Sequence, residues 1–164
     1  MQAQPSLKKL HFEPGEYYLQ CAATKYFLAL RGKHLLLDDT QKLVPTFTGL
    51  VTFVQNQDGS TTLYSSLNDA LLKVDGDGEI VTITQEEKEF AGNDFEDFEL
   101  IQTSGNDGVQ LIIRSIQTQK FVRVSEFKSL RADVTDPIYA SKFVLKPRYL
   151  FKLYIKNHYL HLHP

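Results

Sequence analysis

Histidine is the residue type with the clearest potential for chemistry, and three of the five histidines lie close together near residue 164. His158, His161 and His163 occur in the stretch IKNHYLHLHP. Side chains alternate between faces along a strand, so His161 and His163 would share one face and could reach one metal ion. A structural zinc site usually has four ligands. The other potential ligands have no assigned position: Cys21, His11 and His34. We therefore predict that this stretch forms a strand of the fold and does not bind a metal. The alternatives are a metal site and an irregular tail.

The remaining reactive residue types do not form a catalytic pattern. The stretch DGDGE at 75–79 resembles the start of a calcium loop, but such a loop requires glycine at its sixth position, where this chain has Ile80. A hairpin turn is the better interpretation. The sequence has neither a glycine-rich phosphate loop nor a nucleophile elbow. Cys21 lies in the apolar run YYLQCAAT and is predicted to be a buried structural thiol. We predict a protein that is not an enzyme and that needs no cofactor.

Charge is distributed unevenly along the chain. Residues 1–37 have a net charge of +3, residues 38–107 have −12, and residues 108–164 have +7. This pattern fits either an ordinary solvated surface or a dipolar surface that attracts a charged partner. The basic part contains our candidate partner-binding residues, which are Lys120, Arg123, Lys128 and Arg131.

Length and composition indicate an ordinary globular protein. A chain of 164 residues with 42% hydrophobic residues can bury a substantial core. The first fifteen residues contain no apolar segment of the kind found in signal peptides. No stretch approaches the roughly 18 consecutive apolar residues that suggest a membrane span. With a single cysteine as well, we predict a cytoplasmic protein that does not interact with membranes.

Four short stretches share one pattern, in which a polar opening is followed by alternating apolar residues. They are KYFLAL (25–30), DALLKV (69–74), QKFVRV (119–124) and NHYLHL (157–162). A second motif recurs in phase with the first. Phe53, Phe98 and Phe143 each begin a predicted strand at a constant spacing of 45 residues. A fixed period of this kind indicates a repeat architecture.

The local pattern of each repeat is that of β-structure. The strands are rich in β-branched and aromatic residues. Hairpin turns are predicted at Asp58-Gly59, Asp107-Gly108 and the DGDG at 75–78. Only residues 85–98 are compatible with a short helical turn, and they also suit an exposed loop.

These observations predict an all-β fold, a β-trefoil of three four-strand repeats of about 45 residues. Residues 1–13 would form an N-terminal arm, residues 14–146 the trefoil, and residues 147–164 an extra half-repeat or hairpin. That hairpin could begin a second trefoil or mediate self-association. A propeller built from similar blades is the alternative fold, but a propeller needs at least about four blades, and this chain holds roughly three and a half units with short strands.

The repeats resemble the fascin-like, or actin-crosslinking, branch of β-trefoils. The matching residues are Lys25 to Ala29, Ala70 to Lys73, Lys120 to Arg123 and the three phenylalanine strands. The glycine that precedes the lysine in that family is missing from every copy. The resemblance implies a cytoplasmic binding or scaffolding module that binds or crosslinks filamentous actin. The basic third repeat would then contact the acidic filament.

Two further functions fit the same fold. The first is a carbohydrate-binding, lectin-like trefoil, although the chain has no tryptophan for the Gln-x-Trp motif of ricin-type lectins. The second is nucleic-acid binding, in which Phe121 and Phe127 would stack on bases beside the basic residues. The sequence pI of about 6.2 argues against nucleic acid.

Overall fold

β-Strands dominate the computed structural model, which describes residues 7–39, 44–84, 86–87, 96–103 and 110–150. The strands are β1 (Lys8–Lys9), β2 (Gly15–Cys21), β3 (Phe27–Arg31), β4 (His34–Asp38), β5 (Leu50–Gln55), β6 (Thr61–Ser65), β7 (Leu71–Val74), β8 (Ile80–Ile83), β9 (Asp97–Thr103), β10 (Gln110–Ser115), β11 (Phe121–Val124), β12 (Leu130–Val134) and β13 (Phe143–Pro147). Two short 3-10 helices, η1 (Phe47–Gly49) and η2 (Pro137–Tyr139), precede β5 and β13.

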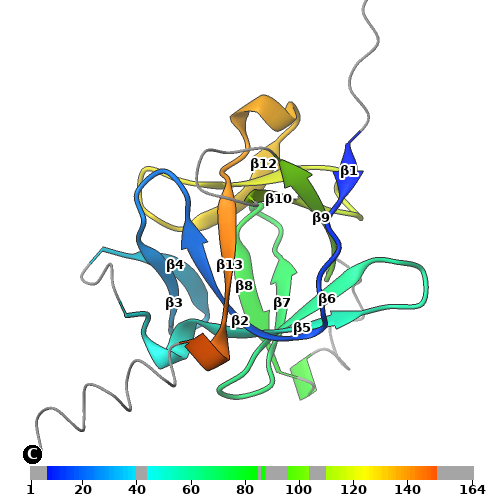
Figure 1. Cartoon of the computed structure of the whole chain (residues 1–164). Coiled ribbons are helices and arrows are strands. Elements are labelled where there is room, and N and C mark those ends of the chain that lie inside the picture. The colour runs from blue at the N-terminus through cyan, green and yellow to red at the C-terminus, as the bar shows by residue number, and fades with distance from the viewer. Residues whose placement is uncertain (1–6, 40–43, 85, 88–95, 104–109, 151–164) are drawn as a thin grey trace, which may run out of the picture.

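Six of these strands form a closed barrel (Figure 1). In order around the barrel they are β2, β5, β6, β9, β10 and β13, and each pairs antiparallel with the next. The last strand pairs back with the first, with Phe143 opposite Cys21 and Pro147 opposite Tyr17. Closure leaves no unpaired edge between these six strands. A single closed barrel also excludes the propeller alternative, because propeller blades are separate sheets.

The other six trefoil strands form three hairpins, β3–β4, β7–β8 and β11–β12. Each hairpin donates a backbone hydrogen bond to the turn of another one. These bonds run from Leu37 N to Lys128 O (2.8 Å), from Thr82 N to Lys33 O (2.8 Å) and from Ala132 N to Gly78 O (2.7 Å). The hairpins are therefore joined in a ring. Three repeats of four strands, with six barrel strands and three hairpins, constitute a β-trefoil, as the sequence predicted.

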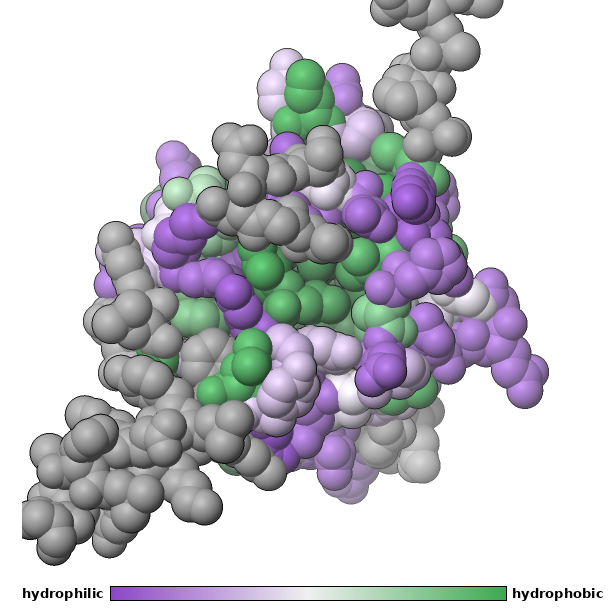
Figure 2. All heavy atoms as spheres, viewed as in Figure 1, coloured by the Kyte–Doolittle hydropathy of each residue, from purple (hydrophilic) through white to green (hydrophobic). Residues whose placement is uncertain are grey.

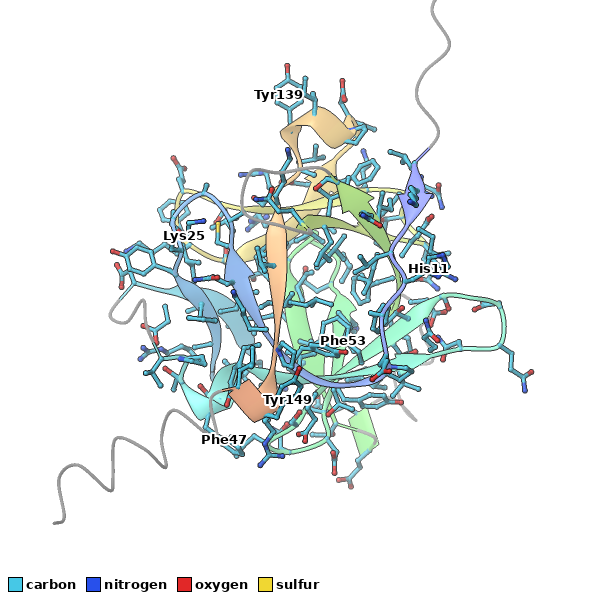
Figure 3. All side chains as sticks on the ribbon, viewed as in Figure 1. His11, Lys25, Phe47, Phe53, Tyr139 and Tyr149 are labelled. Atoms are coloured by element: carbon cyan, nitrogen blue, oxygen red, sulfur yellow. The ribbon has the colours of Figure 1, made fainter. Side chains whose placement is uncertain are left out.

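The repeated apolar residues occupy the core. Phe53, Phe98 and Phe143 are between 0 and 1% exposed and lie on β5, β9 and β13, which are equivalent strands of the three repeats. Leu28, Leu72 and Val122 are equally buried on the first strand of each hairpin. Figure 3 shows Phe53 within the barrel, whereas Tyr139 on η2 projects away from it. The 45-residue spacing of the phenylalanines therefore reflects a threefold core.

Turn geometry is also repeated among the three units. Lys25, Asp69 and Gln119 all have positive φ angles, between 56° and 71°, and each donates its backbone N–H to the residue four positions earlier. The predicted turn at 75–78 is confirmed as the β7–β8 connection. There Asp75 Oδ1 accepts from the backbone of Asp77 and Glu79, both at 2.9 Å.

The N-terminal segment packs against the barrel strands. β1 pairs with β9, and Leu10 is buried in the main core cluster. The Phe12 ring packs edge-to-face on Tyr17 and Phe53, with centroid distances of 6.3 and 5.8 Å. Figure 2 shows apolar side chains at the centre of the face in view, bordered by polar ones. This segment therefore contributes to the core that the repeats form.

Several predicted features lie wholly or partly outside the described residues. These are the Asp107-Gly108 turn, the histidines of the final stretch, and most of the predicted hairpin at 147–164. Arg148 to Leu150 form a helical turn directly after β13. In the segment 85–98, whose sequence is compatible with a helical turn, Glu86 and Glu87 are helical.

Candidate binding site on the third hairpin

The structure brings three of the four predicted partner-binding residues together on the β11–β12 hairpin. Arg123 and Arg131 lie directly opposite each other across the two strands. Lys128 is in the turn that joins them, where it has a φ of 68°. Lys120 immediately precedes β11, at the opposite end of the hairpin. The four residues are therefore distributed along the length of the hairpin.

Two of these four basic side chains are already paired with carboxylates. Arg123 donates from Nε and Nη2 to the two carboxylate oxygens of Asp133, at 2.7 and 2.9 Å. Lys128 forms an ion pair with Asp39. Arg131 donates from Nη1 to the backbone carbonyl of Asp77 at 3.0 Å. Among the residues that the structure describes, Arg131 and Lys120 form no ion pair with a carboxylate, and of these two only Arg131 lies within the hairpin.

Asp133 is expected to stay ionised at unusually low pH. The Arg123 guanidinium hydrogen-bonds this carboxylate and lowers the pKa of Asp133 below its ordinary value of 3.8. Because the folded-state pKa is lowered, the ion pair stabilises the protein above the unfolded-state pKa, and this contribution is lost as the pH falls through the folded value. An NMR titration of the Asp133 carboxyl should therefore have a midpoint below 3.8. The midpoint should rise in Arg123→Gln, and an unchanged midpoint would contradict the pairing.

An exposed aromatic ring completes the group. Phe127 lies in the turn between β11 and β12, and 81% of its surface is exposed. Ser125 N donates to Ser129 O at 2.8 Å, Lys128 N donates to Ser125 O at 2.9 Å, and the two serine hydroxyls hydrogen-bond at 2.8 Å. These bonds within the turn hold the backbone that carries Phe127, so the ring is displayed from an ordered turn.

Phe127 and its neighbours line a hollow of about 380 Å³, which we call the hairpin site. Its residues are Arg123, Ser125, Glu126, Phe127 and Arg131. The volume lies within the usual range for small-molecule sites, and such sites combine apolar surface with a few oriented polar groups. An aromatic ring offers an apolar face, while the guanidinium and carboxylate groups can hydrogen-bond to hydroxyls. This combination suits a polar ligand that has one apolar face.

Sequence reasoning identified the arginines but did not include Phe127 among the candidate residues. It did place Phe127 beside the basic residues as a possible base-stacking ring, together with Phe121. The structure excludes that role for Phe121, which is buried and has the Arg114 guanidinium over its ring at 5.6 Å. The signal for Phe127 was its position in the polar turn SEFKS, where an aromatic residue has no core to fill.

A larger hollow, of about 570 Å³, lies between η2 and β10 and is lined by Leu7, Arg114, Phe121, Thr135, Asp136, Pro137 and Ile138. Its charged groups are already engaged within the protein. Arg114 forms an ion pair with Glu99, and Asp136 accepts from Ile138 N at 3.0 Å as the N-cap of η2. This hollow therefore offers fewer free polar groups than the hairpin site.

The described residues contain no group of three or more histidine, cysteine, aspartate or glutamate side chains that could hold a metal ion. Cys21 is buried and free, and His34 pairs through Nδ1 with Glu79 at 3.2 Å. Within the same residues, no helix is long and apolar enough to cross a membrane.

Comparison with solved structures identifies proteins of the same shape, whereas no protein-family model and no curated protein sequence matches the chain. ThreeFoil, a designed threefold-symmetric protein, has a TM-score of 0.63 and 12% identity, covering 81% of this chain and 99% of its own. SeviL, bound to asialo-GM1 saccharide, has a TM-score of 0.63 and 13% identity over 84% of this chain and 100% of its own. The Macrolepiota procera ricin B-like lectin, in complex with lactose, has a TM-score of 0.58 and 15% identity over 84% of this chain and 99% of its own.

A fourth similar structure is much longer than this chain. It is the GlcNAcα1-4Gal-releasing endo-β-galactosidase from Clostridium perfringens, with a TM-score of 0.63 and 13% identity. The match covers 81% of this chain but 32% of the enzyme, so the chain spans about a third of that protein's length. At these identities the comparisons establish the fold, and the fold is the β-trefoil.

Proposed function

We propose that this chain is a non-enzymatic binding module that holds a carbohydrate at the hairpin site. The observation that carries the proposal is Phe127, a strongly exposed ring on an ordered turn, flanked by Arg123 and Arg131. One face of a pyranose ring is apolar enough to pack on an aromatic side chain, and its hydroxyls need hydrogen-bond partners. Arg123, Glu126, Ser125 and Arg131 provide both donors and acceptors around the ring.

The structural neighbours support this ligand class over an actin filament. Two of them are named with a bound saccharide, lactose in one case and asialo-GM1 saccharide in the other. None of the four names mentions actin or the cytoskeleton. The pairing of Arg123 with Asp133 and of Lys128 with Asp39 also reduces the free positive charge that filament binding would use. The carbohydrate alternative therefore replaces actin binding as our preferred function.

A single site per trefoil is expected, because the three hairpin turns differ in composition. The turn of the first hairpin contains Gly32-Lys33 and that of the second contains Gly76-Asp77. Neither has an aromatic residue at its tip. Calorimetry should consequently give one bound saccharide per chain, and a stoichiometry of three would contradict the assignment to the third hairpin.

The test begins with a glycan array probed with the wild-type chain, followed by calorimetry with the best saccharide. We expect Phe127→Ala to weaken binding at least tenfold, which corresponds to about 1.4 kcal/mol, because the stacking face is removed. Phe127→Tyr should retain most of the affinity, since it keeps the ring.

Tyr139→Ala is the matched control, because Tyr139 is also an aromatic residue with most of its surface exposed but lies on η2, outside the hairpin site. Its affinity should equal that of the wild type. Equal binding by Phe127→Ala and the wild type would exclude the hairpin site, and an array without any bound saccharide would overturn the proposed function.

A further inference from the structure

We infer that the hairpin site selects acidic saccharides, with Arg131 receiving a carboxylate or sulfate group of the ligand. This inference rests on the proposed function and adds the chemical class of the ligand. It depends on the partners of the two arginines of the site. A guanidinium that is already paired with a carboxylate attracts an anionic ligand less than one whose charge is not offset in this way.

Arg131 is held in place without being neutralised. Within the described part of the chain, its guanidinium donates one hydrogen bond, from Nη1 to the Asp77 carbonyl of the second hairpin. Its backbone is also fixed, because Arg131 forms a β-bridge with Glu79 and the next residue, Ala132, donates to Gly78 O at 2.7 Å. A guanidinium has five N–H donors in a planar fork that matches a carboxylate or sulfate. Most of that fork remains available on Arg131.

Arg123 has a different role because Asp133 already occupies its fork. Both carboxylate oxygens of Asp133 accept from Arg123. Arg123 nevertheless lies directly across the strand pair from Arg131. Arg123 therefore lies in the site with its charge offset by Asp133. Within the residues that the structure describes, Arg131 has no such carboxylate partner on the hairpin, so its guanidinium is the group that we expect to bind an anion.

No acidic side chain around the hairpin site offsets the charge of Arg131 in the way that Asp133 offsets the charge of Arg123, among the residues that the structure describes. Asp133 lies near enough to Arg131 for the arginine to help lower the pKa of the carboxyl, but its hydrogen bonds go to Arg123. Glu79 lies 3.2 Å from His34 Nδ1, and Asp39 forms an ion pair with Lys128. Glu126 is the acidic residue among those that line the hollow. The pKa of Arg123 is raised chiefly by its hydrogen bond to Asp133, and the charge of Glu126 adds to this effect.

Glu126 consequently has a predictable effect on specificity. Its charge repels an anionic ligand and has little effect on a neutral one. Removing that charge should strengthen the binding of acidic saccharides relative to the binding of neutral ones. Removing the charge of Arg131 should have the opposite effect. The two substitutions therefore test one electrostatic model in opposite directions.

The experiment compares lactose, sialyllactose and sulfated lactose by calorimetry at low and at physiological salt. We expect the wild type to bind at least one acidic form about tenfold more tightly than lactose, in line with a charge-assisted hydrogen-bonded contact. The difference should shrink as salt increases. Preference for the sialylated form would identify a carboxylate as the anion, and preference for the sulfated form would identify a sulfate.

In Arg131→Gln the preference for the acidic form over lactose should disappear, whatever the change in the affinity for lactose itself. Arg131→Lys should keep part of the preference, because the charge remains but the planar fork is lost. Glu126→Gln should enlarge the preference, and it leaves every contact of Arg131 intact. Thermal unfolding of each variant verifies that the hairpin still folds.

Three outcomes are informative in different ways. Equal wild-type affinity for lactose and both acidic forms would overturn this inference and leave the proposed function standing. A preference for acidic forms that survives in Arg131→Gln would assign it to another residue and would equally overturn the inference. If none of the three saccharides binds and the glycan array is also empty, the proposed function fails and this inference fails with it.

Discussion

Phe98→Ala is expected to lower the free energy of unfolding by about 3–5 kcal/mol, the usual cost of truncating a buried phenylalanine. Phe98 has no exposed surface and belongs to the main core cluster. The neighbouring strands are fixed by barrel pairing on both sides of β9. They cannot collapse fully into the space that the ring leaves, so a cavity adds to the lost transfer free energy.

The same substitution at the equivalent positions extends this prediction. Phe143→Ala should cost a similar amount, and Phe53→Ala should cost more, because Phe53 also packs edge-to-face on Phe12 and Tyr17. Denaturant unfolding monitored by circular dichroism measures all three. The control is Phe127→Ala, which removes an exposed ring and should change stability by less than about 0.5 kcal/mol. A cost below about 1 kcal/mol at Phe98 would contradict the tight packing of a threefold core.

Gly49→Ala should be the most damaging small-residue substitution, with a cost of about 3 kcal/mol or more. Gly49 ends η1 and lies against β3. A Cβ at this position would overlap with the carbonyl oxygen of Leu28 and would approach the Leu28 carbonyl carbon to 3.0 Å and Ala29 Cα to 3.3 Å. These are backbone atoms of a paired strand, so no side-chain rotation can relieve the overlap, and the strand itself has to move.

Gly76→Ala is the matched control for this effect. Gly76 lies in the β7–β8 turn, where a Cβ would meet no heavy atom within 4 Å, and its φ is not positive. Its replacement should be neutral, within about 0.5 kcal/mol. Denaturant midpoints of the two variants give the comparison directly. Similar midpoints would show that space at Gly49 does not limit the packing of η1 on β3.

The trefoil could be predicted from the sequence because the residues that repeat along the chain are the ones that form the core. Three phenylalanines at a constant spacing and three apolar residues at the start of the hairpins occupy positions that each repeat must bury. Such positions depend on local strand alternation and on the period alone. The turn at 75–78 was equally predictable, since Asp75 and Gly78 supply the side-chain acceptor and the positive φ that it requires.

The binding residues were harder to predict because their partners are distant along the chain. Lys128 pairs with Asp39, and Arg131 bonds to Asp77, which belong to the first and second repeats. Charge counting over a segment cannot reveal such pairing. The sequence prediction grouped four basic residues together. In the structure Lys120 lies at the opposite end of the hairpin from Lys128, and both Arg123 and Lys128 are already paired with carboxylates. The fascin-like resemblance likewise indicated the trefoil but did not identify its ligand.

The closing pair of the barrel has a consequence for synthesis of the protein on the ribosome. β2 is translated early, yet its partner β13 is among the last trefoil segments to emerge, and Arg148 beyond it reaches back across 132 positions to Glu16. Until then one edge of β2 has no partner, and bare strand edges attract other chains. At about 5–20 residues per second, translation extends that interval to several seconds or more. During that interval the nascent chain has an open barrel, and its unpaired β2 edge must be kept from pairing with other chains.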